Sequence, residues 1–385
     1  MYFNSKLPNV GTTIFTVMSN MAKEFGAVNL SQGFPDFEPD PYLLELATQY
    51  FYQGKNQYAQ MTGVPVLRER LSEKFNGLYG IHLHEEDEIT ITAGGTQGIF
   101  TVISTLIRPG EEVIYFEPAY DSYRPAIELC GGVAKPIILE GPDYTIDWSL
   151  VRKMFSAQTK LIIINTPNNP TGRIWSANDM QNLQQVLSNT EVYLLSDEVY
   201  EHLIFDGKKH ESILNYPELK ARGFAVFSFG KTYHVTGWKI GYVVAPPLLT
   251  KEFRKVHQFN VFSVNTPLQY ALADYMEDPG QYMKLNHFYE EKRDYFLELI
   301  SGTGLKPLSC EGTYFQCCDY SELSSESDIS FTEWLVKEVG VAAIPLSSFY
   351  HNPPNARIIR FCFAKKEETL ALAGERLKRL RRLTQ

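Results

Sequence analysis

The stretch Phe224-Ala225-Val226-Phe227-Ser228-Phe229-Gly230-Lys231-Thr232 places a lysine directly after a continuous apolar run. An apolar run of this kind, bounded by turn residues, is typical of a strand that is buried on both faces of a sheet. A lysine at the end of such a strand is desolvated, which lowers the pKa of its amine and makes the amine nucleophilic toward carbonyls. The stretch therefore predicts a buried sheet with a reactive amine, Lys231, at its edge.

Further strand-like runs alternate with helical stretches between about residue 30 and about residue 280. This alternation predicts an α/β domain with a largely parallel sheet. The expected strands are Glu88–Thr92, Glu112–Phe116, Lys160–Asn165, Val192–Ser196, Phe224–Phe229 and Ile240–Ala245, with helices such as Thr96–Ile107 and Ala177–Leu187 between them.

The pattern changes after about residue 280. Long helical stretches at Tyr282–Ile300 and Glu367–Arg382, a helix near Phe331–Val339 and short strands predict a smaller α+β domain. An N-terminal segment, residues 1–30, contains a helical piece at Thr13–Phe25. We expect this segment to pack with the small domain, residues 31–280 to form the large domain, and residues 281–385 to form the small one.

Composition excludes several classes of function. The 385 residues carry a formal net charge of −9, which disfavours nucleic-acid partners, and the basic run Lys378–Arg382 is interpreted as a solvated helix end. No apolar run approaches the ~20 residues that span a bilayer, and the N-terminus lacks a signal-peptide pattern. The five cysteines are irregularly spaced without a C-x-x-C pair, so we expect reduced thiols in a cytoplasmic protein. His82 and His84 lie in a charged stretch and are read as surface residues, so no metal site is expected.

Polar residues follow three other expected strands. Ligands bind outside the carboxyl ends of the strands in open α/β sheets. Two glycines, Gly94 and Gly95, open a helix and indicate either an anion site or a tight turn. Residues 165–172, Asn-Thr-Pro-Asn-Asn-Pro-Thr-Gly, form a rigid turn in which two adjacent amides also suit a ligand oxygen.

An acidic residue, Asp197, directly follows the apolar run 192–195, where a charge is costly unless it is paired. It is either the partner of a basic ring nitrogen or a helix cap. A second lysine, Lys239, is positioned for an anion. The pattern Ser228-x-x-Lys231 also matches a β-lactamase signature, but the companion Ser-Asp-Asn and Lys-Thr-Gly elements are absent.

Taken in this order, the motifs resemble the class I/II aminotransferases of pyridoxal-phosphate (PLP) fold type I. The resemblance runs from Asn29-Leu30-Ser31-Gln32-Gly33-Phe34-Pro35-Asp36-Phe37 to Ile359-Arg360-Phe361-Cys362-Phe363-Ala364. Within the family the chain looks like the kynurenine aminotransferase/glutamine transaminase K branch, and like bacterial methionine aminotransferase within it. The expected fold is a mainly parallel sheet in a large domain with a smaller α+β domain.

The resemblance implies roles for the residues around the cofactor. Lys231 would hold PLP as a Schiff base and then carry the proton between the substrate and the cofactor. Asp197 would pair with the pyridine nitrogen, and Tyr120 would stack on the ring. The phenolic oxygen would be bound by Asn169 and Tyr200, and the phosphate by Gly95, Thr96, Ser228 and Lys239.

Further residues are implied for the substrate and for a second subunit. Arg360 would clamp the α-carboxylate with two parallel donors, helped by Asn169 and the backbone of Gly33. Tyr58 would reach the phosphate of the other subunit in a homodimer. The expected side-chain pocket is Ile14, Phe15, Phe262, Phe349 and Tyr350, which favours methionine, aromatic amino acids or glutamine.

Three activities fit such a chain. The first is ping-pong transfer of an α-amino group from an amino acid to a 2-oxo acid. The second is a PLP-dependent lyase that cleaves C–S bonds of cysteine conjugates, because both reactions share deprotonation at Cα. The third, a non-catalytic PLP-binding regulator, is disfavoured because the aminotransferase motifs begin close to the start of the chain.

Overall fold

The computed structural model describes residues 4–383; the outermost residues of the expected N-terminal segment and of the expected small domain lie outside them. The strands are β1 (Val28–Asn29), β2 (Ile89–Thr92), β3 (Glu112–Glu117), β4 (Val133–Ile138), β5 (Thr159–Asn165), β6 (Tyr193–Asp197), β7 (Gly223–Ser228), β8 (Gly241–Val244), β9 (Lys306–Pro307), β10 (Phe315–Asp319), β11 (Val341–Ala342), β12 (Ile344–Pro345) and β13 (Ile358–Cys362). The α-helices are α1 (Ile14–Glu24), α2 (Pro41–Tyr52), α3 (Pro65–Tyr79), α4 (Glu85–Glu88), α5 (Gly95–Leu106), α6 (Tyr123–Leu129), α7 (Trp148–Met154), α8 (Ala177–Leu187), α9 (Pro217–Lys220), α10 (Phe229–Thr232), α11 (Pro247–Asn260), α12 (Thr266–Tyr275), α13 (Gly280–Met283), α14 (Leu285–Ile300), α15 (Asp328–Trp334), α16 (Glu367–Leu377) and α17 (Leu380–Leu383). Short 3₁₀ turns lie at Ile213–Asn215, Thr236–Trp238 and Leu346–Phe349, and a π-helical turn follows α15 at Leu335–Val339.

A seven-stranded sheet forms the larger part of the molecule, in the order β2-β8-β7-β6-β5-β3-β4. The five strands from β7 to β4 are mutually parallel, and β8 alone runs opposite to its two neighbours. The expectation of an α/β fold with a mainly parallel sheet is confirmed. Strand β4 was not expected, because it lies at the edge and leaves Val133 and Ile138 exposed, so it has no continuous apolar run.

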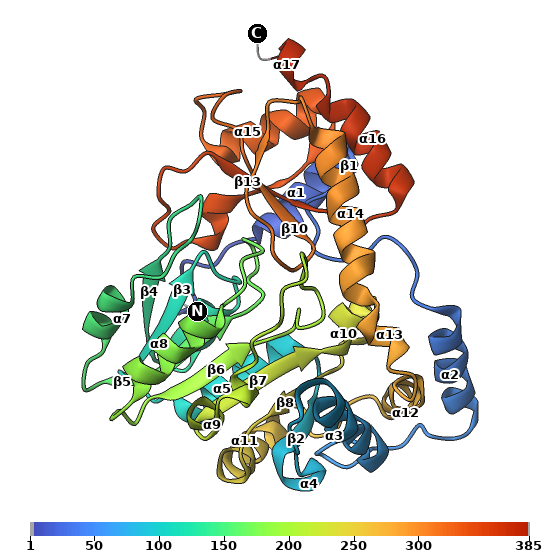
Figure 1. Ribbon diagram of the computed structural model, residues 1–385, viewed down its shortest axis with the longest axis vertical. Coiled ribbons are helices and arrows are strands. Elements are labelled where there is room, and N and C mark those ends of the chain that lie inside the picture. Colours follow the sequence, from blue (N-terminus) through green and yellow to red (C-terminus); the bar gives the residue numbers. More distant parts are fainter. Residues whose placement is uncertain (1–3, 384–385) are drawn as a thin grey trace.

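Apolar clusters cover both faces of this sheet. Alternate residues of a strand point to opposite faces, so Val113 of β3 packs with helices α5 and α11 while Ile114 packs with the cluster that includes α3 and α8. Figure 1 shows these helices on either side of the sheet in the lower half of the molecule. Burial on both faces explains why the strands read as unbroken apolar runs.

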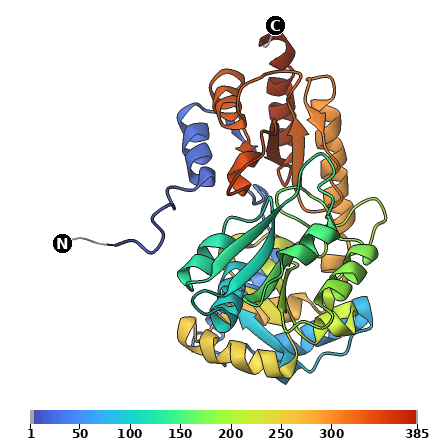
Figure 2. The same cartoon turned by 90° about the vertical axis from the view of Figure 1, so that its left-hand side faces the viewer.

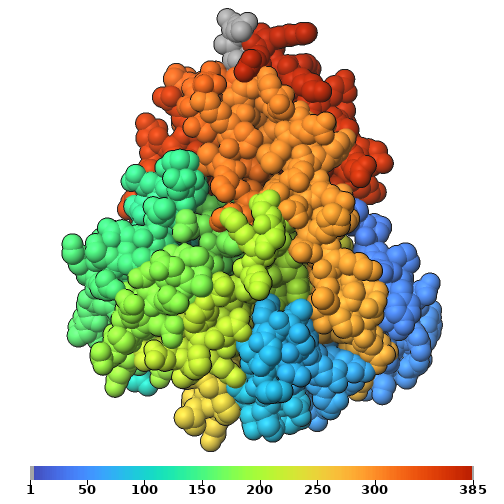
Figure 3. All heavy atoms as spheres, viewed as in Figure 1, coloured from blue at the N-terminus to red at the C-terminus, as the bar shows by residue number. Residues whose placement is uncertain are grey.

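A second sheet, β12-β13-β10-β9, is antiparallel and lies in the upper half of Figure 1 with α14 and α16. The expected helix at 282–300 is divided into α13 and α14 at Lys284, and the expected helix at 367–382 is divided into α16 and α17. Figure 3 shows the residues of this C-terminal region capping those of the larger sheet. The expected division of the chain near residue 280 stays a prediction.

The N-terminal segment returns to this upper region. Strand β1 pairs in parallel with β11, so Val28 lies opposite Val341. Helix α1, which precedes β1, lies beside the C-terminal elements in Figure 2 and shares an apolar cluster with β12. Residues 30–34, which follow β1, therefore pass between the two sheets.

Candidate active site

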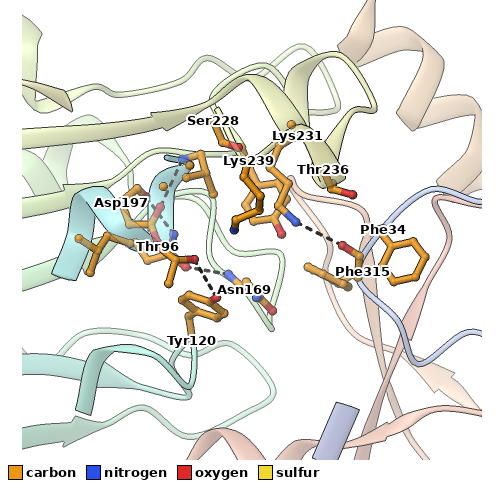
Figure 4. Close-up of a pocket in the computed structure, with 18 of the residues that line it drawn as sticks. Phe34, Thr96, Tyr120, Asn169, Asp197, Ser228, Lys231, Thr236, Lys239 and Phe315 are labelled. Atoms are coloured by element: carbon orange, nitrogen blue, oxygen red, sulfur yellow. Dashed lines mark hydrogen bonds between the residues drawn. The ribbon is translucent and has the colours of Figure 1, made fainter. Parts of the chain in front are cut away.

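A cavity of about 240 Å³ opens at the carboxyl ends of β5, β6 and β7. Its wall is contributed by the first turn of α5, the segment 32–34 and strands β10 and β13 of the second sheet. The cavity thus lies where the two sheets meet, at the edge where α/β proteins bind ligands. Figure 4 shows Lys231 and Lys239 pointing into it, with Thr96 and Tyr120 on one side and Phe34 and Phe315 on the other.

The amine of Lys231 lies on α10, immediately after β7. Its Nζ is 2.8 Å from Tyr314 Oη and 3.2 Å from the Gly33 carbonyl oxygen. Burial, together with the neighbouring cations Lys239 and Arg360, lowers the pKa of Lys231 to about 8. An amine with such a pKa is partly neutral near pH 7, as a nucleophile or general base must be.

The carboxylate of Asp197 ends β6 at the floor of the cavity and is buried. Its Oδ2 accepts a 2.6 Å hydrogen bond from the hydroxyl of Tyr123, and its Oδ1 is 3.4 Å from the Val199 backbone nitrogen. Burial raises the pKa of Asp197 to about 6, while the Tyr123 hydroxyl opposes that rise. Within residues 4–383 no cation is within ion-pair distance of Asp197, although Lys231 acts on it electrostatically, so this buried carboxylate is suited to receive a protonated ring nitrogen.

A pair of asparagines at the end of β5 is connected to the backbone of Asp197. The side chain of Asn165 donates a 2.9 Å hydrogen bond to the Asp197 backbone carbonyl and accepts one of 2.8 Å from the Asn169 backbone nitrogen. Both asparagines line the cavity. Asn165 therefore fixes the spacing between Asp197 and Asn169, two residues on different strand ends.

The opposite end of the cavity is built for an anion. Helix α5 begins at Gly95, so the N–H groups of Gly95 and Thr96 have no acceptor within the helix. Lys239 adopts a left-handed backbone conformation, φ 54°, which is costly for a residue with a side chain. A Cβ built on Gly94 would lie 3.4 Å from Lys239 Nζ, so this glycine leaves the amine room beside the helix. Ser228 completes the group, and the Thr96 hydroxyl lies 3.1 Å from that of Tyr120.

The guanidinium of Arg360 is buried on β13 at the far side of the cavity. It donates to Asn169 Oδ1 at 2.7 Å and to the Ser31 carbonyl at 3.2 Å. Its Cζ lies 3.9 Å from the centre of the Phe315 ring, and burial lowers its pKa. No carboxylate among residues 4–383 forms an ion pair with Arg360. A buried cation in this condition is suited to an anionic ligand.

Comparison with known proteins agrees with this arrangement. The family model for aminotransferase class I and II matches residues 26–377. The chain belongs to the class I and II aminotransferases. It is 49% identical to the methionine aminotransferase of Escherichia coli K12, with 98% of each chain covered, and 31% identical to kynurenine–oxoglutarate transaminase 1 of Rattus norvegicus, again with 98% of each covered.

Solved structures of aminotransferases superpose over nearly the whole chain. A methionine aminotransferase structure from E. coli matches with a TM-score of 0.97 at 49% identity, covering 98% of this chain and all of that one. The N-succinyldiaminopimelate aminotransferase of Mycobacterium tuberculosis matches with a TM-score of 0.94 at 32% identity, covering 98% and 100%. Class I aminotransferases of this fold use pyridoxal 5′-phosphate, which is therefore the cofactor of this aminotransferase.

The cavity of the aminotransferase brings together most of the residues expected from the sequence. They are Phe15, Gly33, Gly95, Thr96, Tyr120, Asn169, Asp197, Tyr200, Ser228, Lys231, Lys239 and Arg360. Within the protomer, Tyr58 and Phe262 lie elsewhere: they contact each other at 5.3 Å between ring centroids and are 82% and 46% exposed. The expected side-chain pocket is therefore divided, because Ile14, Phe349 and Tyr350 cluster with Phe15 while Phe262 does not.

Three site residues were not expected from the sequence. Tyr123 binds Asp197, Tyr314 binds Lys231, and Asn165 connects Asp197 with Asn169. Asn165 carried a recognisable signal, since it ends an apolar strand as Asp197 does. Tyr123 and Tyr314 carried none, because each reaches its partner across the fold from a distant part of the chain.

Proposed function

We propose that the enzyme transfers the α-amino group of methionine, and also of aromatic amino acids or glutamine, to a 2-oxo acid in a ping-pong reaction. The observation that carries the proposal is the presence, in one cavity, of a buried amine, a buried carboxylate and a buried guanidinium that forms no ion pair with any residue that the structure describes. These are the three groups that such a transfer needs, as base, ring partner and carboxylate clamp.

The cofactor fits the polar groups in one orientation. The N-terminus of α5 with Ser228 and Lys239 suits the phosphate, and Asp197 at the other end suits the ring nitrogen. Tyr120 would cover one side of the ring, and Asn169 with Tyr200 would hold the phenolic oxygen, since all three residues line the cavity. When bound, pyridoxal phosphate supplies a carbonyl that condenses with amines and a ring that withdraws electrons.

The chain's own residues then orient the substrate and move its proton. Arg360 and Asn169 hold the α-carboxylate beside Lys231, which fixes the direction of the substrate Cα–H bond. With the cofactor bound, Lys231 would take the proton from the substrate Cα as a base. It would then deliver that proton, as an acid, to the former carbonyl carbon of the cofactor. Phe34 and Phe315 at the cavity wall limit the access of water.

The preference for apolar side chains rests on the surroundings of Arg360. Phe15 and Phe349 pack edge to face at 5.9 Å, and both rings lie over the guanidinium. Arg360 is the one arginine among the residues described as lining the cavity, which leaves no second clamp for an acidic side chain. The names of the relatives, methionine aminotransferase and kynurenine–oxoglutarate transaminase, support the same class of substrates.

The test is a half-reaction without an acceptor oxo acid. L-Methionine added to the cofactor-loaded protein converts the absorption of the pyridoxal form into that of the pyridoxamine form, and L-aspartate does so far more slowly. Release of ammonia and pyruvate from a cysteine conjugate, again without an acceptor oxo acid, would instead support the C–S lyase alternative. An unchanged spectrum with every amino acid contradicts the proposal.

A homodimer with shared sites is part of the proposal. Tyr58, Phe259 and Phe262 are large apolar side chains that are 82%, 88% and 46% exposed, which is unusual for a monomer's surface. A second copy that covered them would bring its Tyr58 to the phosphate end of the cavity. Mixing Lys231→Ala protein with Tyr58→Ala protein then restores activity, because each hybrid dimer holds one intact site; no recovery after subunit exchange contradicts the shared site.

We place this enzyme in the cytoplasm. All five cysteines are free thiols, four of them buried, as a reducing compartment maintains them. Among residues 4–383, no helix combines the length and apolar character needed to cross a membrane. Fractionation of the source cells tests this placement.

A further inference from the structure

The amine of Lys231 lies against two oxygen atoms that also bind each other. Its Nζ is 2.8 Å from Tyr314 Oη and 3.2 Å from the Gly33 carbonyl oxygen, and these two oxygens are 2.7 Å apart. A carbonyl only accepts, so the single hydrogen of the Tyr314 hydroxyl is donated to Gly33. The oxygen of Tyr314 therefore faces Lys231 as an acceptor.

The two acceptors hold the amine of Lys231 from one side. The two oxygens are closer to each other than either is to Nζ, so both lie on the same side of the nitrogen. No other hydrogen-bond acceptor for this nitrogen is present among residues 4–383. Figure 4 shows the amine at the cavity, with its dashed bond on the side where Phe34 and Phe315 lie. The contact with Tyr314 therefore helps to fix where the amine sits in the cavity.

We propose that Tyr314 is a further catalytic residue, which holds the amine of Lys231 in position for proton transfer from the substrate. The inference rests on the proposed transamination. The Cα–H bond breaks, its electron pair stays with carbon, and an N–H bond forms on Lys231. This third N–H bond then breaks as the proton moves to the acceptor carbon of the cofactor, so Lys231 ends as it began. Tyr314 exchanges no proton in either step.

The surroundings of Tyr314 suit an orienting role. The residue is fully buried and its ring contacts those of Tyr200, Tyr289 and Phe315, with centroids 5.2, 5.7 and 4.8 Å away. Burial raises the pKa of its hydroxyl well above the ordinary value, so the hydroxyl stays protonated. A Cβ built on Gly33 would lie 2.9 Å from the Phe315 ring, so a glycine is needed where its carbonyl approaches Lys231.

The test compares Tyr314→Phe with a matched deletion next to it. Tyr289→Phe also removes a buried hydroxyl, one that has no hydrogen-bond partner among the described residues and does not contact the amine. In single-turnover reactions with L-methionine, Tyr314→Phe is expected to slow the half-reaction about tenfold or more, as the loss of one hydrogen bond at the reacting atom predicts. The deuterium isotope effect of α-deuterated methionine rises and KM changes little, while Tyr289→Phe behaves as the parent protein.

A second readout uses the protein without cofactor. Labelling of amines by reductive methylation, followed by carbon NMR, reports the pKa of Lys231 once its signal is assigned by its loss in Lys231→Ala. An acceptor stabilises the ammonium form, so Tyr314→Phe lowers the pKa of Lys231 below the value in the parent protein. An unchanged isotope effect together with an unchanged pKa would overturn the inference, even if the rate fell. If the parent protein itself shows no half-reaction with any amino acid, the proposed function fails; if the parent reacts and Tyr314→Phe matches it, this inference alone fails.

Discussion

Removal of one hydroxyl, in Tyr123→Phe, should move the pH dependence of the reaction. In the parent protein this hydroxyl donates a 2.6 Å hydrogen bond to Asp197, and the two residues are only 2% and 3% exposed. The carboxylate keeps only the weaker bond from the Val199 backbone nitrogen at 3.4 Å.

The size of the effect follows from these contacts. A hydrogen bond to a charged group contributes about 1.5–3 kcal/mol, and about 1.36 kcal/mol corresponds to one pKa unit. The pKa of Asp197 should therefore rise from about 6 to about 7–8. At pH 7 the ionised fraction falls from roughly nine-tenths to between a half and a tenth.

The sign of the change in rate is fixed by the charge. A protonated Asp197 no longer pairs as an anion with the ring nitrogen, so activity is lost as the pH falls through its pKa. The pKa values given above belong to the cofactor-free protein, and a protonated ring nitrogen beside Asp197 would lower its pKa in the parent and in the variant alike. Relative to the parent, the acid limb of the half-reaction profile with saturating L-methionine should still move to higher pH in Tyr123→Phe, and the rate should recover above that limb. Tyr115→Phe is the matched control, because it removes a buried hydroxyl bonded to Glu117, away from the cavity. Superimposable profiles for Tyr123→Phe and the parent would refute the reasoning.

Four other changes test the remaining groups. Lys231→Ala should abolish turnover while circular dichroism shows a folded protein. Near-normal turnover would show that Lys231 is not the base of the reaction. Arg360→Lys replaces two parallel donors by one point charge, so KM should rise about 10- to 100-fold for every amino acid with a smaller change in kcat; equal KM values would exclude the clamp. Lys239→Met should weaken binding of pyridoxal phosphate about tenfold or more without altering the affinity for pyridoxal, which lacks the phosphate; an equal loss for both ligands would point to a structural role. The pKa of Asp197 in the folded protein is about 6, above its ordinary 3.8, so its contribution to stability is complete below pH 3.8 and lost as the pH rises through 6. Asp197→Asn should therefore raise the free energy of unfolding of the cofactor-free protein at pH 7 by up to about 3 kcal/mol, measured with denaturant. A destabilised variant would contradict the raised pKa.

Features that the sequence revealed share a local cause. Strands buried on both faces must be apolar throughout, so β5, β6 and β7 were visible as runs, and polar residues just after them were visible as exceptions. Lys231 and Asp197 were expected for that reason. The roles of Arg360 and Tyr58 were predicted from the resemblance to a family, because the residues next to them in the sequence indicate no function.

Features that the sequence concealed depend on contacts between distant segments. Tyr314 meets Lys231 only because the second sheet folds over the carboxyl ends of the first, and no periodicity reports that approach. Strand β4 escaped detection because an edge strand need not be apolar on both faces. The helix expected at 282–300 divides at Lys284, where no glycine or proline marks the break.

The short pairing of β1 with β11 has a consequence for the order of folding. It places residues 28–29 beside residues 341–342, so the two paired segments are separated by several hundred residues of chain. Contacts between segments so far apart cost loop-closure entropy and form late. The half of the site that contains Gly33 and Arg360 should therefore assemble after the half that contains Lys231 and Asp197.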